Sequence, residues 1–158
     1  MKRIIFCSFF LLLILNSACK KDSAAANNSD YLIFGHFYGM CGGEQCIEIF
    51  KLNSCKLYED SRDQYPRQDT FYSGIYTQLS NQQFNDVKDL MDFFPQDLLN
   101  ENDTVIGMPD AGDWGGFYIE YNFNGTRKFW ILDKMKSNVP VQYHSFMDKL
   151  EEKIGLLQ

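Results

Sequence analysis

The chain has 158 residues, of which 45% are hydrophobic and 16% aromatic, a size that suggests one domain. That much apolar surface excludes intrinsic disorder over most of the chain. The formal net charge of −6 disfavours a nucleic-acid partner, because an acidic surface repels phosphates. The two histidines leave little capacity for acid–base chemistry near neutral pH.

The N-terminus has the pattern of an export signal. Lys2 and Arg3 form a positive start, and the twelve residues from Ile4 to Leu15 are nearly all apolar. As a helix this run is about 18 Å long, too short for a hydrocarbon core of about 30 Å. A short apolar run behind a positive start indicates a secretory signal peptide.

The residues after this run make the signal more specific. Ser17-Ala18-Cys19 resembles the lipobox of bacterial lipoproteins, although Asn16 departs from the aliphatic residue usual at its position. The resemblance implies cleavage before Cys19 and acylation of that cysteine by fatty acids such as palmitate. The alternatives are an ordinary secretory signal cleaved at or near Ala18, or an uncleaved anchor.

These signals divide the chain into three parts. We expect a lipoprotein signal peptide over 1–18, a flexible polar tether over 19–30 and a single globular domain over 31–158. Cleavage leaves 13 basic and 21 acidic residues, a net charge of −8. Anionic headgroups repel such a domain, so the lipid anchor has to hold it at the membrane.

Hydrophobic patterning predicts an α+β domain. We expect strands over 31–38, 46–52, 55–59, 71–79, 117–123 and 126–132, and helices over 81–94 and from Pro140 onward. Ser80 and Gln83 have the spacing of a capping box, and Asn124-Gly125 favours a type I′ hairpin. Residues 96–116 read as a long irregular stretch. The predicted fold is an antiparallel sheet of about five to six strands, with two amphipathic helices packed on one face.

The cysteines of the exported chain lie in an oxidising compartment. Once Cys7 leaves with the signal and Cys19 is acylated, Cys41, Cys46 and Cys55 remain. A hairpin with residues 42–45 as its loop places Cys41 opposite Cys46, which predicts a disulfide, with Cys55 reduced and buried. Unpaired buried thiols and a metal or redox site are the alternatives, although no second Cys/His pair is spaced to complete a zinc site.

The stretch 109–116 is the most unusual in composition. Asp110 and Asp113 are separated by two residues and could bind Ca²⁺, whereas a glycine-rich turn capped by Asp side chains is the structural alternative. An exposed Trp114 in this acidic loop would suit recognition of a sugar or a protein. We expect no metal and no cofactor, and we treat these three residues as a candidate ligand or partner loop.

A thiol nucleophile is the sharpest enzymatic hypothesis. His36 lies near Cys41 in sequence, but strand alternation places the two on opposite faces, and His144 falls between the apolar positions of its helix. We assign no catalytic residue.

The cysteine-bearing hairpin, the Pro-Asp-x-x-Asp-x-Gly-Gly segment at 109–116 and the closing helix resemble small uncharacterised lipoproteins of the Bacteroidetes type, over most of 31–157. The resemblance implies a lipid-anchored place in the cell envelope at the outer membrane, and no activity. Cys19-Lys20-Lys21-Asp22 is similar to the segment that favours surface display in that group, and a periplasm-facing anchor is the alternative.

The leading interpretation is a non-enzymatic binding domain. It would contact a protein or glycan partner through the turn 42–45 or the loop 110–116. The alternative is a small cell-envelope enzyme, hydrolytic or thiol-dependent.

Overall fold

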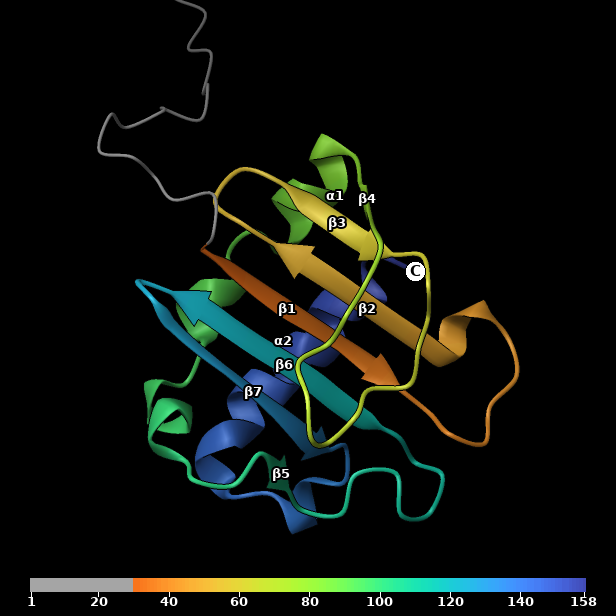
Figure 1. Ribbon diagram of the computed structural model, residues 1–158, viewed down its shortest axis with the longest axis vertical. Coiled ribbons are helices and arrows are strands. Elements are labelled where there is room, and N and C mark those ends of the chain that lie inside the picture. Colours follow the sequence, from red (N-terminus) through yellow and green to blue (C-terminus); the bar gives the residue numbers. More distant parts are fainter. Residues whose placement is uncertain (1–29) are drawn as a thin grey trace, which may run out of the picture.

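Seven strands form one sheet, in the order β4-β3-β2-β1-β6-β7-β5, in the computed structural model, which describes residues 30–158 (Figure 1). The strands are β1 (Tyr31–Phe37), β2 (Ile47–Leu52), β3 (Leu57–Asp60), β4 (Tyr76–Gln78), β5 (Val105–Ile106), β6 (Gly116–Phe123) and β7 (Thr126–Asp133). All neighbours are antiparallel except β5 and β7, which are parallel. The predicted α+β class is confirmed. The sheet itself differs from the prediction: it has seven strands rather than five to six, and it is mixed rather than antiparallel.

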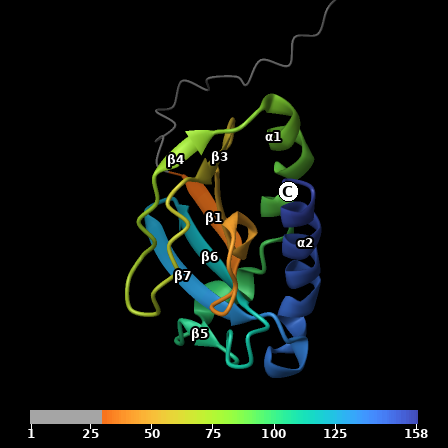
Figure 2. The same cartoon turned by 90° about the vertical axis from the view of Figure 1, so that its right-hand side faces the viewer.

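The helices are α1 (Asn81–Val87) and α2 (His144–Gly155), and both cover the same face of the sheet (Figure 2). Short 3-10 turns complete the chain: η1 (Glu44–Cys46), η2 (Leu90–Phe93), η3 (Gln96–Asn100), η4 (Lys136–Asn138) and η5 (Val141–Tyr143). The predicted stretch 96–116 is thus less irregular than expected, because it contains η3 and β5. No helix within residues 30–158 is long and apolar enough to cross a membrane.

The predicted signal peptide (1–18), Cys19 and residues 19–29 of the predicted tether lie outside the described residues.

The β6–β7 hairpin has the predicted register. Asn124 and Gly125 have φ angles of 51° and 80°, the positive values that a type I′ turn requires. Ile119 faces Trp130 and Phe117 faces Leu132, as expected.

The capping box of α1 is present, with Ser80 and Gln83 bonded to each other's backbone N–H. The helix predicted over 81–94 is broken, because α1 ends at Val87 and η2 follows. Phe94 has an extended ψ of 122° ahead of Pro95, as the proline ring demands.

The segment 61–75, which we call the strap, links β3 to β4 and crosses the sheet face opposite the helices (Figures 1 and 2). The strand predicted over 71–79 is therefore reduced to β4. Phe71 and Tyr72 pack down onto the sheet as part of the strap, and the N–H of Tyr72 donates to the phenolic oxygen of Tyr118 at 2.9 Å.

The sheet is consequently buried on both faces. The core on the helix side is large and is built around Trp130, Phe34 and Phe146. The core under the strap is smaller and contains Ile33, Phe37, Ile49, Tyr118, Phe129 and Ile131.

Strand β1 lies in the middle of the sheet. It begins at Tyr31, where the described chain starts, and ends at Phe37, next to the β1–β2 and β5–β6 connections (Figure 1). Both regions that the sequence singled out as contact surfaces therefore lie at the same end, far from residue 30.

Candidate functional site

The connection between β1 and β2 is closed by a disulfide. Cys41 and Cys46 are bonded, with their Cα atoms 5.6 Å apart, so the predicted bridge is confirmed. The N–H of Tyr38 donates to the carbonyl of Cys46 at 2.9 Å, which extends the β1–β2 ladder into the loop. The bridge and this hydrogen bond restrict the conformations of residues 38–46.

Cys55 differs from the prediction of a buried side chain. It is exposed on the turn between β2 and β3. The carboxamide oxygen of Asn53 accepts the N–H groups of Cys55 and Lys56, at 3.0 and 2.8 Å. This Asx-type turn projects beyond the strands, which is why the residue is exposed.

Asp110 joins three segments of the chain. Its Oδ2 accepts the N–H of Gly39 at 2.7 Å and the hydroxyl of Tyr65, in the strap, at 2.9 Å. Its Oδ1 accepts the N–H of Gly115 at 3.0 Å, within its own loop. Burial, and then the hydrogen bond to Asp110, raise the pKa of Tyr65 to about 12. One carboxylate thus holds the β1–β2 connection, the strap and the β5–β6 connection together.

Trp114 and Asp113 lie in the same loop but differ in role. The indole N–H of Trp114 donates to Oδ1 of the buried Asp133 at 2.8 Å, so the ring is half-buried and anchored to the end of β7. Asp113 is exposed, with a φ of 61°, and within residues 30–158 no hydrogen bond reaches its carboxylate. The predicted loop residues thus divide into two that fix the loop and one that faces solvent.

Asp133 was not identified from the sequence. Besides the Trp114 indole, it accepts the N–H groups of Met108 and Met135, at 3.0 and 2.8 Å, and the side-chain amide of Asn138, at 2.7 Å. These contacts fix both ends of the β5–β6 connection to the end of β7. In the sequence Asp133 reads only as an acidic residue at the end of a strand.

The loop 109–116 does not provide a set of ligands for Ca²⁺ in this structure. Within the described part of the chain, no group of three or more His, Cys, Asp or Glu residues is placed to hold a metal ion. The carboxylate of Asp110 is already occupied by its three donors.

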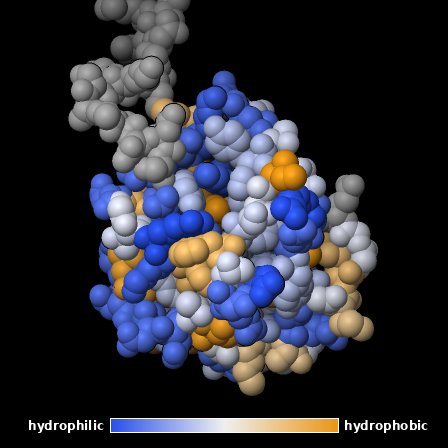
Figure 3. Space-filling view, viewed as in Figure 1, coloured by the Kyte–Doolittle hydropathy of each residue, from blue (hydrophilic) through white to orange (hydrophobic). Residues whose placement is uncertain are grey.

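Exposed apolar side chains gather where these loops meet. We call this surface the three-loop end: residues 38–46, strap residues 63–67 and residues 107–115. Met40 is 81% exposed, Met108 57% and Tyr65 48%. In Figure 3, weakly apolar surface lies along the lower and right rim, over the β1–β2 and β5–β6 connections, while most of that face is hydrophilic. Large apolar side chains on fixed loops are a common feature of protein-binding surfaces.

The residues of the thiol-enzyme alternative are engaged elsewhere. Cys41 is in the disulfide. His36 is buried, its Nε2 lies 3.2 Å from the carbonyl oxygen of Gln45, and burial followed by the charge of Lys134 lowers its pKa. His144 is half-buried, and its Nε2 lies 2.9 Å from the carbonyl oxygen of Val139.

A buried polar network lies under the strap and was not identified from the sequence. Glu120 is fully buried, and its carboxylate accepts the hydroxyls of Tyr31 and Tyr118, both at 2.8 Å, and Nε of Arg127 at 2.9 Å. Burial, and then the charge of Glu120, raise the pKa of Tyr118. Because Tyr118 also accepts the N–H of Tyr72, this network ties the strap to the sheet.

A second buried carboxylate closes the strap at its base. Asp60, at the end of β3, accepts the hydroxyl of Tyr72 at 2.6 Å and the N–H groups of Ile75 and Asp63, at 2.5 and 3.2 Å. The strap is therefore fixed at its base by Asp60 and at the three-loop end by Asp110.

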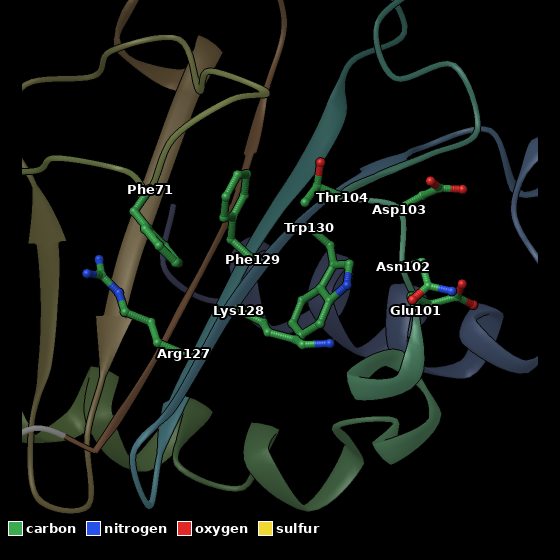
Figure 4. Close-up of a pocket in the computed structure, with 9 residues that line it drawn as sticks. All are labelled: Phe71, Glu101, Asn102, Asp103, Thr104, Arg127, Lys128, Phe129 and Trp130. Atoms are coloured by element: carbon green, nitrogen blue, oxygen red, sulfur yellow. The ribbon is translucent and has the colours of Figure 1, made fainter.

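A shallow cavity of about 210 Å³ lies at the edge of β7 (Figure 4). It lies between that strand and residues 101–104, and the ring of Phe71 borders it on the strap side. This cavity could not be predicted from the sequence, because its walls come from three separate segments.

Comparisons with protein-family models, with curated proteins and with solved structures found no match.

Proposed function

We propose that this protein is a lipid-anchored component of the bacterial cell envelope whose domain binds a partner protein through the three-loop end. The acyl group would be carried by Cys19, and the outer membrane is the proposed location. One observation supports the binding role: the two loops that the sequence predicted as contact surfaces, 42–45 and 110–116, lie together on one rigid, partly apolar surface. Asp110 links them directly through the N–H of Gly39.

The position of this surface fits a tethered protein. The seven residues of β1 span about 23 Å between the start of the domain and the three-loop end. A chain held through residues before Tyr31 would therefore present the three-loop end away from its membrane.

The chemistry of the surface favours a protein partner over a glycan. Met40 and Met108 contribute flexible, polarisable side chains that adapt to another apolar surface. Trp114, the side chain best suited to stack on a sugar, is instead anchored to Asp133.

Anchoring is tested by expressing the wild type and Cys19→Ala in a Bacteroidetes host fed with labelled palmitate. We expect the wild type to carry label and to enter the detergent phase of a Triton X-114 separation, and the variant to lose both properties. An unlabelled wild type in the aqueous phase would refute the anchor and leave the binding surface to be tested separately.

Binding is tested by photo-crosslinking in living cells. We replace Met40, Met108 or Phe93 with p-benzoylphenylalanine, Phe93 being an exposed control on the helix face. We expect one protein to be captured from both methionine positions and not from position 93, and the Asp110→Ala background to weaken that capture. Capture of glycan only, or equal capture at all three positions, would refute the proposed surface.

A further inference from the structure

Exposed methionines gather at one end of the sheet. Met40, Met108 and Met135 are 81%, 57% and 40% exposed, and they follow the ends of β1, β5 and β7. Because β1 and β7 both run antiparallel to β6, and β5 runs parallel to β7, these three strands end on the same side. The remaining methionines among residues 30–158, Met91 and Met147, pack in the helix-side core, where Met147 is 2% exposed.

The backbone beside the two methionines of the three-loop end is fixed by carboxylates. The N–H of Gly39, the residue before Met40, donates to Asp110 at 2.7 Å. The N–H of Met108 donates to Asp133 at 3.0 Å. Both bonds use backbone groups, so a chemical change at the thioether sulfur leaves them in place.

The cysteines of this surface are already oxidised. Cys41 and Cys46 are joined in the disulfide, so residues 38–46 present no thiol to an oxidant. The thioethers of Met40 and Met108 are then the sulfur atoms of the three-loop end on which a two-electron oxidant can act. Susceptibility of methionine to oxidation follows its exposure, which favours these two residues over the buried Met147.

We propose that hydrogen peroxide oxidises Met40 and Met108 to methionine sulfoxide, and that this modification prevents partner binding at the three-loop end without unfolding the domain. In each reaction a lone pair of the sulfur attacks one peroxide oxygen, and the S–O bond forms as the O–O bond breaks. The second oxygen leaves with both protons as water, so the sulfur loses two electrons and the peroxide gains them. This inference rests on the proposed function, because it concerns the regulation of the same surface.

The loss of binding follows from the polarity of the product. A sulfoxide replaces a flexible apolar side chain with a polar one, which disrupts contacts that depend on methionine. In an apolar interface its oxygen would lose hydrogen bonds to water without gaining a replacement. Methionine sulfoxide reductases restore the thioether, so the modification is reversible.

The first measurement follows oxidation site by site. Full-length protein in detergent micelles is treated with hydrogen peroxide, and the gain of oxygen at each methionine is read from peptide masses. We expect Met40 and Met108 to react at least about tenfold faster than Met147 in the folded protein, and all three to react at equal rates in urea. The urea midpoint of protein oxidised at the exposed positions should equal that of untreated protein. Equal rates in the folded protein, or a lowered midpoint, would overturn the proposal.

The second measurement tests regulation with a matched variant. Met40→Leu/Met108→Leu keeps an apolar surface of similar volume but removes both sulfur atoms. In the wild type and in this variant, p-benzoylphenylalanine replaces Gln64, an exposed strap residue, and captures the partner in living cells with or without hydrogen peroxide. We expect peroxide to lower capture at least about fivefold in the wild-type background and to leave it unchanged in the double variant.

The outcomes separate regulation from binding. Capture that survives complete oxidation of Met40 and Met108, or that falls equally in the double variant, would overturn the regulation and leave the binding surface in place. Absence of capture from both forms before peroxide is added would refute the proposed function, and the regulation with it.

Discussion

Replacing Asp110 by Ala should loosen the three-loop end more than any other single change there. The carboxylate accepts three hydrogen bonds, from Gly39, Tyr65 and Gly115. Because the site is half-buried, we take about 1 kcal/mol for each bond, the middle of the range for neutral pairs, which gives about 3 kcal/mol. Ala at a φ of 61° adds about 1 kcal/mol of backbone strain.

Asp113 provides a matched control, because it shares the φ of 61° in the same loop but is exposed. Asp113→Ala should cost only the strain, about 1 kcal/mol. The free energies of unfolding, measured by urea titration, should therefore differ by about 3 kcal/mol between the two variants. Asp110→Asn, which tolerates this φ and keeps one acceptor oxygen, should fall between them. A difference below about 1 kcal/mol would show that Asp110 does not hold the three loops together.

Glu120→Gln should lower the free energy of unfolding, measured by urea titration, by about 2–3 kcal/mol. The reason is that the N–H groups of the new amide would face the phenol or arginine donors that the carboxylate now accepts. A change of less than about 0.5 kcal/mol would contradict the buried network. Burial lowers the pKa of His36 from its ordinary 6.5, so the unfolded chain binds the proton first and stability should fall as the pH drops below about 6.5. His36→Gln should flatten that dependence in thermal scans from pH 7 to 5, and an undiminished slope in this variant would show that another group causes it. The double variant Cys41→Ser/Cys46→Ser should lose about 2 kcal/mol, the loop-closure entropy of a six-residue ring, and should match the wild type measured in reductant.

The features that the sequence predicted well have local causes. Asn124-Gly125 determines its own turn, and the turn then sets the whole β6–β7 register. The capping box at Ser80 and the disulfide between Cys41 and Cys46 likewise depend on residues close in the chain. In each case the partner is within a few residues, so composition and spacing suffice.

The features that it missed depend on distant partners. Phe71 and Tyr72 are residues that favour strands. In the structure they pack on the sheet face instead, because Phe71 contacts Phe129 and Tyr72 bonds to Tyr118. Strand β5 is two residues long and pairs in parallel, with no local turn to reveal it.

The buried acids were missed for the same reason. Glu120 lies between Ile119 and Tyr121, so strand alternation places it on the opposite face from those apolar side chains and predicts that it faces solvent. In the structure the strap covers that face and Glu120 is buried. Asp110 was identified as a residue of interest, but its bonds to Gly39 and Tyr65 connect segments that sequence spacing cannot bring together.

The central position of β1 has a mechanical consequence. Its residues Tyr31 to Phe37 are paired with β6 along their whole length and, except for Tyr31, with β2. A force applied between residue 30 and a partner bound at Met40 would act parallel to β1. The hydrogen bonds that join β1 to β2 and to β6 lie perpendicular to that direction. The bonds would then be sheared together rather than unzipped one at a time, so the domain should resist tension best along the direction in which a tethered protein is pulled.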